Sequence, residues 1–221
     1  MSTEPTATPS ASVPRRWGRS VGSILIWILV LPWVSTSVRA QSPEPDRNPV
    51  YQELLVARQT FYDAVEEKDK IGLAEDRFEG IIEARPSLAV RANAYLGSLK
   101  GLRAKHSVMP WSQIVWVRRC LSQLDAALKQ APDDLEVVFL HAVICHNLPF
   151  FFGRRDDSVA DFRGLIELLP EHHTDYDLRI LNDIFNNIIE RSRLSEEEIA
   201  RARQLRVDLG YPKLKPERHG D

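Results

Sequence analysis

Apolar residues recur every three or four positions along most of the chain, which is the spacing of one face of an α-helix. From residue 49 onward, eight such stripes follow one another, separated by prolines, glycines and residues that cap helices. The last stripe opens with the capping box Ser195-x-x-Glu198 and closes at Gly210. No stretch alternates apolar and polar residues over the length of a strand. The pattern therefore predicts an all-α protein of about eight helices.

The first 40 residues have a different pattern. A segment rich in Ser, Thr, Pro and Ala is followed by three arginines and then by an apolar run over residues 21–34. Small residues at positions 38 and 40 follow this run, so residues 1–40 are typical of a secretory signal peptide that is cleaved after Ala40. The alternative is an uncleaved membrane anchor, although a spanning helix needs about 20 apolar residues and Pro32 interrupts the run. Residues 41–49 are rich in proline and polar residues and are predicted to form a linker.

After the linker, one spacing of small, large and apolar residues before a proline occurs three times. The small residue allows a neighbouring helix to approach, the large residue fills the space between helices, and the proline ends the helix. Such self-similarity predicts stacked helical pairs. The three segments are Ala74-x3-Phe78-x2-Ile81-x4-Pro86, Cys120-x3-Leu124-x2-Ala127-x4-Pro132 and Ser158-x3-Phe162-x2-Leu165-x4-Pro170.

The repeated pattern resembles the second helix of the tetratricopeptide repeat family. Leu96-Gly97 stands where that family has a Leu-Gly pair in its first helix. The family's tryptophan is missing, however, and Tyr62 occupies a position that the family gives to a small residue. The resemblance implies a helical-hairpin solenoid, with three tetratricopeptide-like pairs in residues 50–170 and a degenerate fourth pair or C-terminal cap in residues 171–221.

The resemblance also implies that the concave face of the solenoid is the ligand surface. The repeat register places Asn93, Lys100 and His141 near this face, and the alternative for each is an ordinary solvated side chain. His141 and Cys145 share one helix face, but a metal site needs three or four converging ligands, so packing or groove contact is favoured and no metal is expected. Cys120 and Cys145 lie on successive predicted helices and either form a disulfide or act as small core residues.

Two of the repeat units contain insertions, because their prolines are 46 and 38 residues apart against a family period of about 34. The inserted segments, residues 104–111 and 148–155, combine aromatic and basic side chains and are expected on one edge of the solenoid. One interpretation is a binding edge for a partner that carries a carboxylate or phosphate. The other is that at least two of the three phenylalanines fold back between the units and that Arg155 only starts a helix. The candidate binding residues are Trp111, Phe150, Phe151, Phe152, Arg154 and Arg155.

Composition and charge exclude several classes of function. The 221 residues include 29 Lys and Arg against 31 Asp and Glu, and removal of residues 1–40 leaves a net charge of −5. This balance argues against a protein that binds nucleic acid through bulk positive charge. Two cysteines are too few for a disulfide scaffold or a zinc site made only of cysteines. No hydrolase, metalloprotease or nucleotide-binding motif is present, so neither a catalytic residue nor a cofactor is expected.

Together these features predict an exported, non-catalytic adaptor of a bacterial cell envelope that binds an unidentified protein partner through the concave groove or the inserted-loop edge. Its location would be periplasmic or secreted, or the outer face of the inner membrane if the leader is retained. The membrane would then be contacted only by the N-terminal segment. The alternative is a solute-binding or accessory subunit of an envelope transport system, which holds a small anionic ligand through Arg154 or Arg155. An enzyme whose site no motif reveals is a third interpretation.

Overall fold

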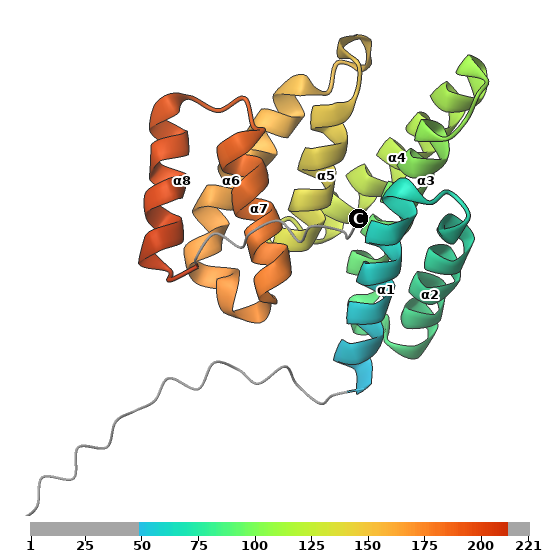
Figure 1. Cartoon of the computed structure of the whole chain (residues 1–221), viewed down its shortest axis with the longest axis horizontal. Helices are drawn as coiled ribbons and strands as arrows, with labels where there is room; N and C mark the ends of the chain where they lie inside the picture. The colour runs from blue at the N-terminus through green and yellow to red at the C-terminus, as the bar shows by residue number, and fades with distance from the viewer. Residues whose placement is uncertain (1–48, 212–221) are drawn as a thin grey trace, which may run out of the picture. The chain divides into compact units, whose positions relative to one another are not determined.

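The computed structural model describes residues 49–211, and helices account for most of this range (Figure 1). This part of the chain has eight α-helices, three short 3-10 helices and no strand, so the prediction of an all-α protein is confirmed. The predicted leader (residues 1–40), the predicted linker up to residue 48 and the last residues of the chain lie outside the described residues. The α-helices are α1 (Pro49–Glu66), α2 (Lys70–Ala84), α3 (Ala89–Lys105), α4 (Pro110–Gln130), α5 (Leu135–Asn147), α6 (Arg155–His172), α7 (Leu178–Glu190) and α8 (Glu196–Asp208).

Consecutive helices pack against each other as hairpins, α1 with α2, α3 with α4, α5 with α6 and α7 with α8 (Figure 1). Each of the first two hairpins also contacts the next, because α2 packs on α3 and α4 packs on α5. The first helices of successive hairpins, α1, α3, α5 and α7, contact one another in the same order. Two apolar cores result, one built mainly by α1 to α4 and the other by α5 to α8.

The nine small, large and apolar positions of the repeated pattern are all buried. Among them, Phe78 and Phe162 are almost completely enclosed, and burial of each such side chain contributes roughly 1.5–3 kcal/mol. A small residue also lets α3 approach α4 closely, since a Cβ added to Gly97 would lie 3.2 Å from the Cγ atom of Leu124. The pattern therefore identifies residues at which helices contact one another.

One of the three repeat prolines does not end its helix. Pro86 and Pro132 lie just beyond α2 and α4, as predicted, but α6 continues two residues past Pro170. Proline removes one backbone hydrogen bond from a helix. The helix is maintained around this gap because the amide of His173 donates to the carbonyl of Leu169, and the chain continues directly into the 3-10 helix η3 (His173–Asp175).

The insertion between α3 and α4 lengthens the helices rather than the turn. Only residues 106–109 connect α3 to α4, and α4 has 21 residues against 15 in α2. The expectation of a loop over residues 104–111 is therefore wrong. At the C-terminal end of this segment, Pro110 explains why the residues are helical. Proline is favoured at the first position of a helix, and α4 begins at Pro110.

Candidate functional site

A buried charge cluster joins α1, α3 and α5 to the N-terminus of α7. Arg58 of α1 binds Glu136 of α5 through two parallel hydrogen bonds, from Nε to Oε1 at 2.6 Å and from Nη2 to Oε2 at 2.5 Å. Its Nη1 atom donates to Oδ2 of Asp177 at 2.8 Å. The side chains of Arg58 and Glu136 are internal, since these residues are only 4% and 0% exposed. We call the whole group the Arg58 cluster, and its members are Arg58, Arg91, Tyr95, Asp134, Glu136, Tyr176 and Asp177.

Arg91 of α3 forms the second half of the Arg58 cluster. Its Nε and Nη2 atoms donate to Oδ2 of Asp134 at 3.0 and 2.7 Å, and its Nε atom lies 3.2 Å from Oε2 of Glu136. Asp134 also caps α5 by accepting hydrogen bonds from two backbone amides at the start of that helix. The hydroxyl of Tyr95 donates to Oε1 of Glu136, and the hydroxyl of Tyr176 accepts from Arg91. Glu136 is therefore held by side chains from two helices, α1 and α3.

The carboxylates hold both guanidinium groups in their charged form. Burial acts to lower the pKa of Arg58 and of Arg91, but Glu136 and the other acidic groups nearby together outweigh burial and raise both pKa values above the ordinary range. Burial, together with the charge of Glu136, raises the pKa of Tyr95 well above its usual value. The hydroxyl of Tyr95 therefore stays protonated and donates a hydrogen bond to Glu136. An external ligand that displaced any of these partners would leave a buried charge unpaired, which is costly.

The groove expected on this side of the protein is therefore occupied by the chain's own side chains. The hydroxyl of Tyr62 on α1 donates to Oδ2 of Asp183 on α7 at 2.7 Å, and the guanidinium of Arg179 lies 4.3 Å from the centre of the Tyr62 ring. Tyr62 is the large residue at a position that the repeat pattern gives to a small one. The side chain of Tyr62, which departs from the pattern, therefore contacts the fourth hairpin.

Asn93 and Lys100 of α3 do not lie on this side, so their predicted position on the groove is wrong. Both contact Gln123 of α4: its Nε2 atom donates to Oδ1 of Asn93 at 3.0 Å, and its Oε1 atom accepts from Nζ of Lys100. The helical period explains the error, since these two positions are about half a turn around α3 from Arg91 and Tyr95. The repeat register identified the right helix but the wrong face.

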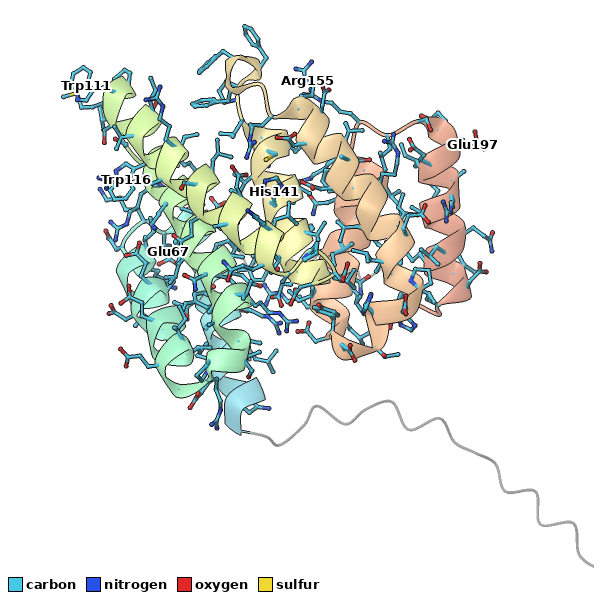
Figure 2. The ribbon with its side chains drawn as sticks, turned by 180° about the vertical axis from the view of Figure 1, so that it is seen from behind. Glu67, Trp111, Trp116, His141, Arg155 and Glu197 are labelled. Carbon is cyan, nitrogen blue, oxygen red and sulfur yellow. The ribbon has the colours of Figure 1, made fainter. Side chains whose placement is uncertain are left out.

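His141 is enclosed between α4, α5 and α6, so it cannot contact a ligand in a groove. It is 3% exposed, with Nδ1 at 2.5 Å from Oδ2 of Asp161 and Nε2 at 2.9 Å from Oδ1 of Asp125. Figure 2 shows it among these three helices. Burial acts to lower its pKa, but the hydrogen bond to Asp161 and the other nearby groups outweigh burial and raise the pKa to about 10. His141 is therefore an imidazolium at neutral pH, and both ring nitrogens donate to carboxylates.

The two cysteines are free and buried. Sγ of Cys145 lies 3.7 Å from Nε2 of His141, and burial raises the pKa of the Cys120 thiol to about 12, so Cys120 stays protonated. Among the described residues, no three His, Cys, Asp or Glu side chains come together as ligands for a metal ion.

The phenylalanine loop between α5 and α6 exposes two of its three rings. Phe150 and Phe151 are 79% and 65% exposed, and only Phe152 is half-buried, so the expectation that at least two rings fold back is wrong. The three residues form the 3-10 helix η2 (Phe150–Phe152), which ends at Gly153 with a left-handed φ of 69°. This tight turn holds the first two rings away from the core, and their edge-to-face contact, with ring centres 6.0 Å apart, leaves their outer faces open.

The two arginines that follow the loop differ in their availability. Arg154 is engaged, because its Nη2 atom donates to Oδ1 of Asp125 and its Nη1 atom lies 2.8 Å from Oδ2 of Asp157. Arg155 is exposed, lies in the first turn of α6 and has no ion pair within the described part of the chain (Figure 2). Of the two predicted anion contacts, only Arg155 is therefore free of a carboxylate partner.

Trp111 lies in the first turn of α4 and is 67% exposed. Figure 2 shows it at the free end of the α3–α4 hairpin, on the same side of the hairpin stack as the α5–α6 loop. Both inserted segments thus present large apolar side chains at one end of the helices. We call this end the loop edge, and its exposed apolar residues are Val108, Met109, Trp111, Phe150 and Phe151.

Sequence reasoning missed the Arg58 cluster, although α5 contains a signal for it. Residues 135–145 of this helix are apolar around its whole circumference except for Glu136 and His141. A helix that is apolar on all sides is buried, and buried ionisable side chains require charged or hydrogen-bonding partners. Glu136 and His141 could therefore have been predicted to be paired, but not with which residues.

The chain matches no protein-family model, no curated protein and no solved structure in three comparisons. Within residues 49–211, no helix is both long and apolar enough to span a bilayer.

Proposed function

We propose that the protein is a non-catalytic adaptor with a tetratricopeptide-like solenoid, and that it binds a protein partner through the phenylalanine loop of the loop edge. The solenoid is supported by the burial of all nine repeat positions and by the stacking of successive hairpins. The observation that carries the binding surface is the exposure of Phe150 and Phe151. Large aromatic side chains that enter a pocket of the partner are typical anchors of protein interfaces.

The concave side is the weaker of the two binding surfaces that the sequence suggested. Its charged residues already pair with one another in the Arg58 cluster. The surroundings of the phenylalanine loop suit a protein partner, because the exposed Arg155 stands beside the carboxylates Asp156 and Asp157. Such mixed charges around apolar anchors resemble the polar rim of a protein interface.

The location that we propose is the bacterial cell envelope, and it rests on the signal-peptide pattern of residues 1–40. A cleaved leader would place the adaptor in the periplasm or outside the cell. A retained leader would tether it to the outer face of the inner membrane.

Photo-crosslinking in producing cells tests the binding surface. A photoreactive phenylalanine analogue in place of Phe151 should give a discrete adduct with one protein. The matched control places the same analogue at Val207 of α8, which is similarly exposed and belongs to another hairpin. No adduct at position 151, or the same adduct at both positions, would show that the phenylalanine loop does not bind the partner.

A solute-binding role is the second candidate, and a hollow on α3 and α4 supports it. Lys100, Arg118, Arg119, Ser122 and Gln123 line this hollow, so a small anion would meet three cations there. The residues that hold the anion would then be Lys100, Arg118 and Arg119. Arg154 would not hold it, because its charge is already paired with Asp125 and Asp157. Native mass spectrometry of the purified protein should then show a bound small anion that is lost from the Arg118→Gln variant.

A further inference from the structure

The α3–α4 hairpin is strongly basic within a protein that is acidic as a whole. No Asp or Glu occurs from residue 84 to residue 124. Arg91 and Arg103 of this hairpin pair with carboxylates of other helices, but Lys100, Arg118 and Arg119 have no ion pair within the described part of the chain. These three side chains line one hollow on the outer surface of the hairpin. An uncompensated positive charge therefore lies on one side of α4.

The exposed face of α4 changes from apolar to basic along the helix. Trp111, Ile114 and Val115 are exposed and are followed on the same face by Arg118 and Arg119, because positions three, four and seven residues apart share one side of a helix. The turn before α4 continues the apolar part. We call this apolar part the α4 tip, and its residues are Val108, Met109, Trp111, Ile114 and Val115.

The α4 tip lies at the end of a hairpin that extends beyond its neighbour. Figure 2 shows Trp111 well past the α1–α2 turn, which is marked by Glu67. A projecting apolar end does not enclose a peptide or a helix, which require a groove. It can, however, enter a flat and deformable partner.

We propose that the α4 tip docks on an anionic phospholipid surface, with Arg118 and Arg119 at the level of the phosphates. Seven residues of helix separate Trp111 from Arg118, which is a rise of about 10 Å. The headgroup layer of one leaflet is about 5–7 Å thick. When Arg118 and Arg119 bind phosphates, Trp111 therefore reaches the hydrocarbon boundary, where tryptophan is favoured. The order of the side chains along α4 matches the order of layers in a bilayer.

This docking goes beyond the proposed adaptor role and uses different residues. The phenylalanine loop, with carboxylates beside it, is proposed for a protein partner, whereas the α4 tip has no acidic residue nearby in the sequence. An adaptor of this kind would bind its partner close to a membrane surface. The two proposals can therefore fail independently. Absence of crosslinks at Phe151 would contradict only the adaptor role, and absence of lipid binding at the α4 tip would contradict only the docking.

Fluorescence of the full chain labelled at the tip tests the proposal. Val108→Cys provides an exposed thiol for an environment-sensitive dye, and the native cysteines are buried. The dye emission should increase and shift to the blue with vesicles of phosphatidylcholine and phosphatidylglycerol, and much less with phosphatidylcholine alone. Each basic residue near an anionic surface contributes about fivefold to partitioning, so Arg118→Gln with Arg119→Gln should lower it about 25-fold.

Two matched controls and a soluble competitor decide the outcome. Arg77→Gln with Arg85→Gln removes the same charge from exposed sites in and just after α2 and should leave partitioning unchanged. A dye at Val207→Cys should not respond, and an equal response there would show that another segment inserts. Equal binding to both vesicle types would overturn the role of the arginines. A response to soluble polyglutamate without one to vesicles would identify an acidic protein partner and overturn the lipid proposal.

Discussion

His141 belongs to the almost apolar helix α5 and lies between Asp125 of α4 and Asp161 of α6. These two carboxylates determine its protonation. Its pKa of about 10 in the folded protein lies above the ordinary value of 6.5. A group whose pKa rises on folding stabilises the protein fully below its unfolded pKa, and this stabilisation is lost as the pH rises through the folded pKa. The window of loss for His141 therefore extends from about pH 6.5 to pH 10.

Replacement of His141 by Gln should accordingly matter most at low pH. We expect the free energy of unfolding of the wild type to exceed that of His141→Gln by on the order of 3 kcal/mol more at pH 6 than at pH 10. Urea unfolding of both proteins at several pH values, followed by circular dichroism, measures the difference. Titrating groups that do not contact His141 cancel in this comparison, so a difference that does not vary with pH would contradict the assignment of an imidazolium.

Glu136 compensates the charges of Arg58 and Arg91 in the Arg58 cluster. Glu136→Gln leaves the buried guanidinium of Arg58 and the half-buried guanidinium of Arg91 undercompensated, and it should lower the free energy of unfolding by about 3–5 kcal/mol. Adding Arg58→Met to this variant removes one unpaired charge and should recover part of the loss. Chemical unfolding of the two single variants and the double variant measures the coupling, and strictly additive losses would show that the pair does not interact.

For single residues, the sequence predicted which apolar side chains are buried, but it did not predict which polar side chains pair with one another. Phe78, Leu124 and Phe162 were predicted to pack between helices because their spacing repeats, and all three are buried. The partners of Arg58 are 78 and 119 residues away along the chain. Helical periodicity relates residues within one element only, so it carries no information about such pairs.

The hairpins differ in length because inserted residues were added to helices in one case and to a turn in the other. The distance between the repeat prolines gives the size of an insertion but not its form. The extra residues between Gly97 and Leu124 extend α3 and α4, where Pro110 starts a helix. Those after α5 form a turn, because Pro149 and Gly153 bracket the phenylalanines and a left-handed residue there ends the helical path.

Two glycines in helix interiors should respond in opposite directions to alanine. Gly80 of α2 has open space where a Cβ would be, so Gly80→Ala should stabilise the protein by up to about 1 kcal/mol. At Gly97 the new Cβ would meet the enclosed Leu124 at 3.2 Å, and overpacking of this kind costs about 1–3 kcal/mol. Thermal unfolding of both variants checks the contrast, and a gain in melting temperature for Gly97→Ala would show that α3 and α4 can separate at no cost.

The helices of residues 49–211 form a more closed arrangement than a linear stack of repeats. In an open solenoid, each repeat contacts only its neighbours, but here α1 of the first hairpin bonds to Asp177 and Asp183 of the fourth. The sequence predicted the number and order of the helices. It did not predict this closure, because the angle between hairpins depends on packing details that the repeat pattern does not contain.

Closure should make the described hairpins unfold together. In the wild type, hydrogen exchange measured by mass spectrometry should give α1 and α7 similar free energies of opening. Asp177→Asn with Asp183→Asn removes the charges that hold the two hairpins together, and α7 and α8 should then exchange earlier than α3 and α4. Exchange that is unchanged in the variant would mean that the apolar contacts alone couple the ends.

The pairing of Arg58 with Asp177 also sets an order of events during synthesis. A ribosome adds about 5–20 residues per second, so the 119 residues between the two take between about 6 and 24 seconds. Throughout this interval the newly made first hairpin carries a guanidinium whose second partner does not yet exist. The nascent chain therefore cannot reach its final fold before residue 177 has been made.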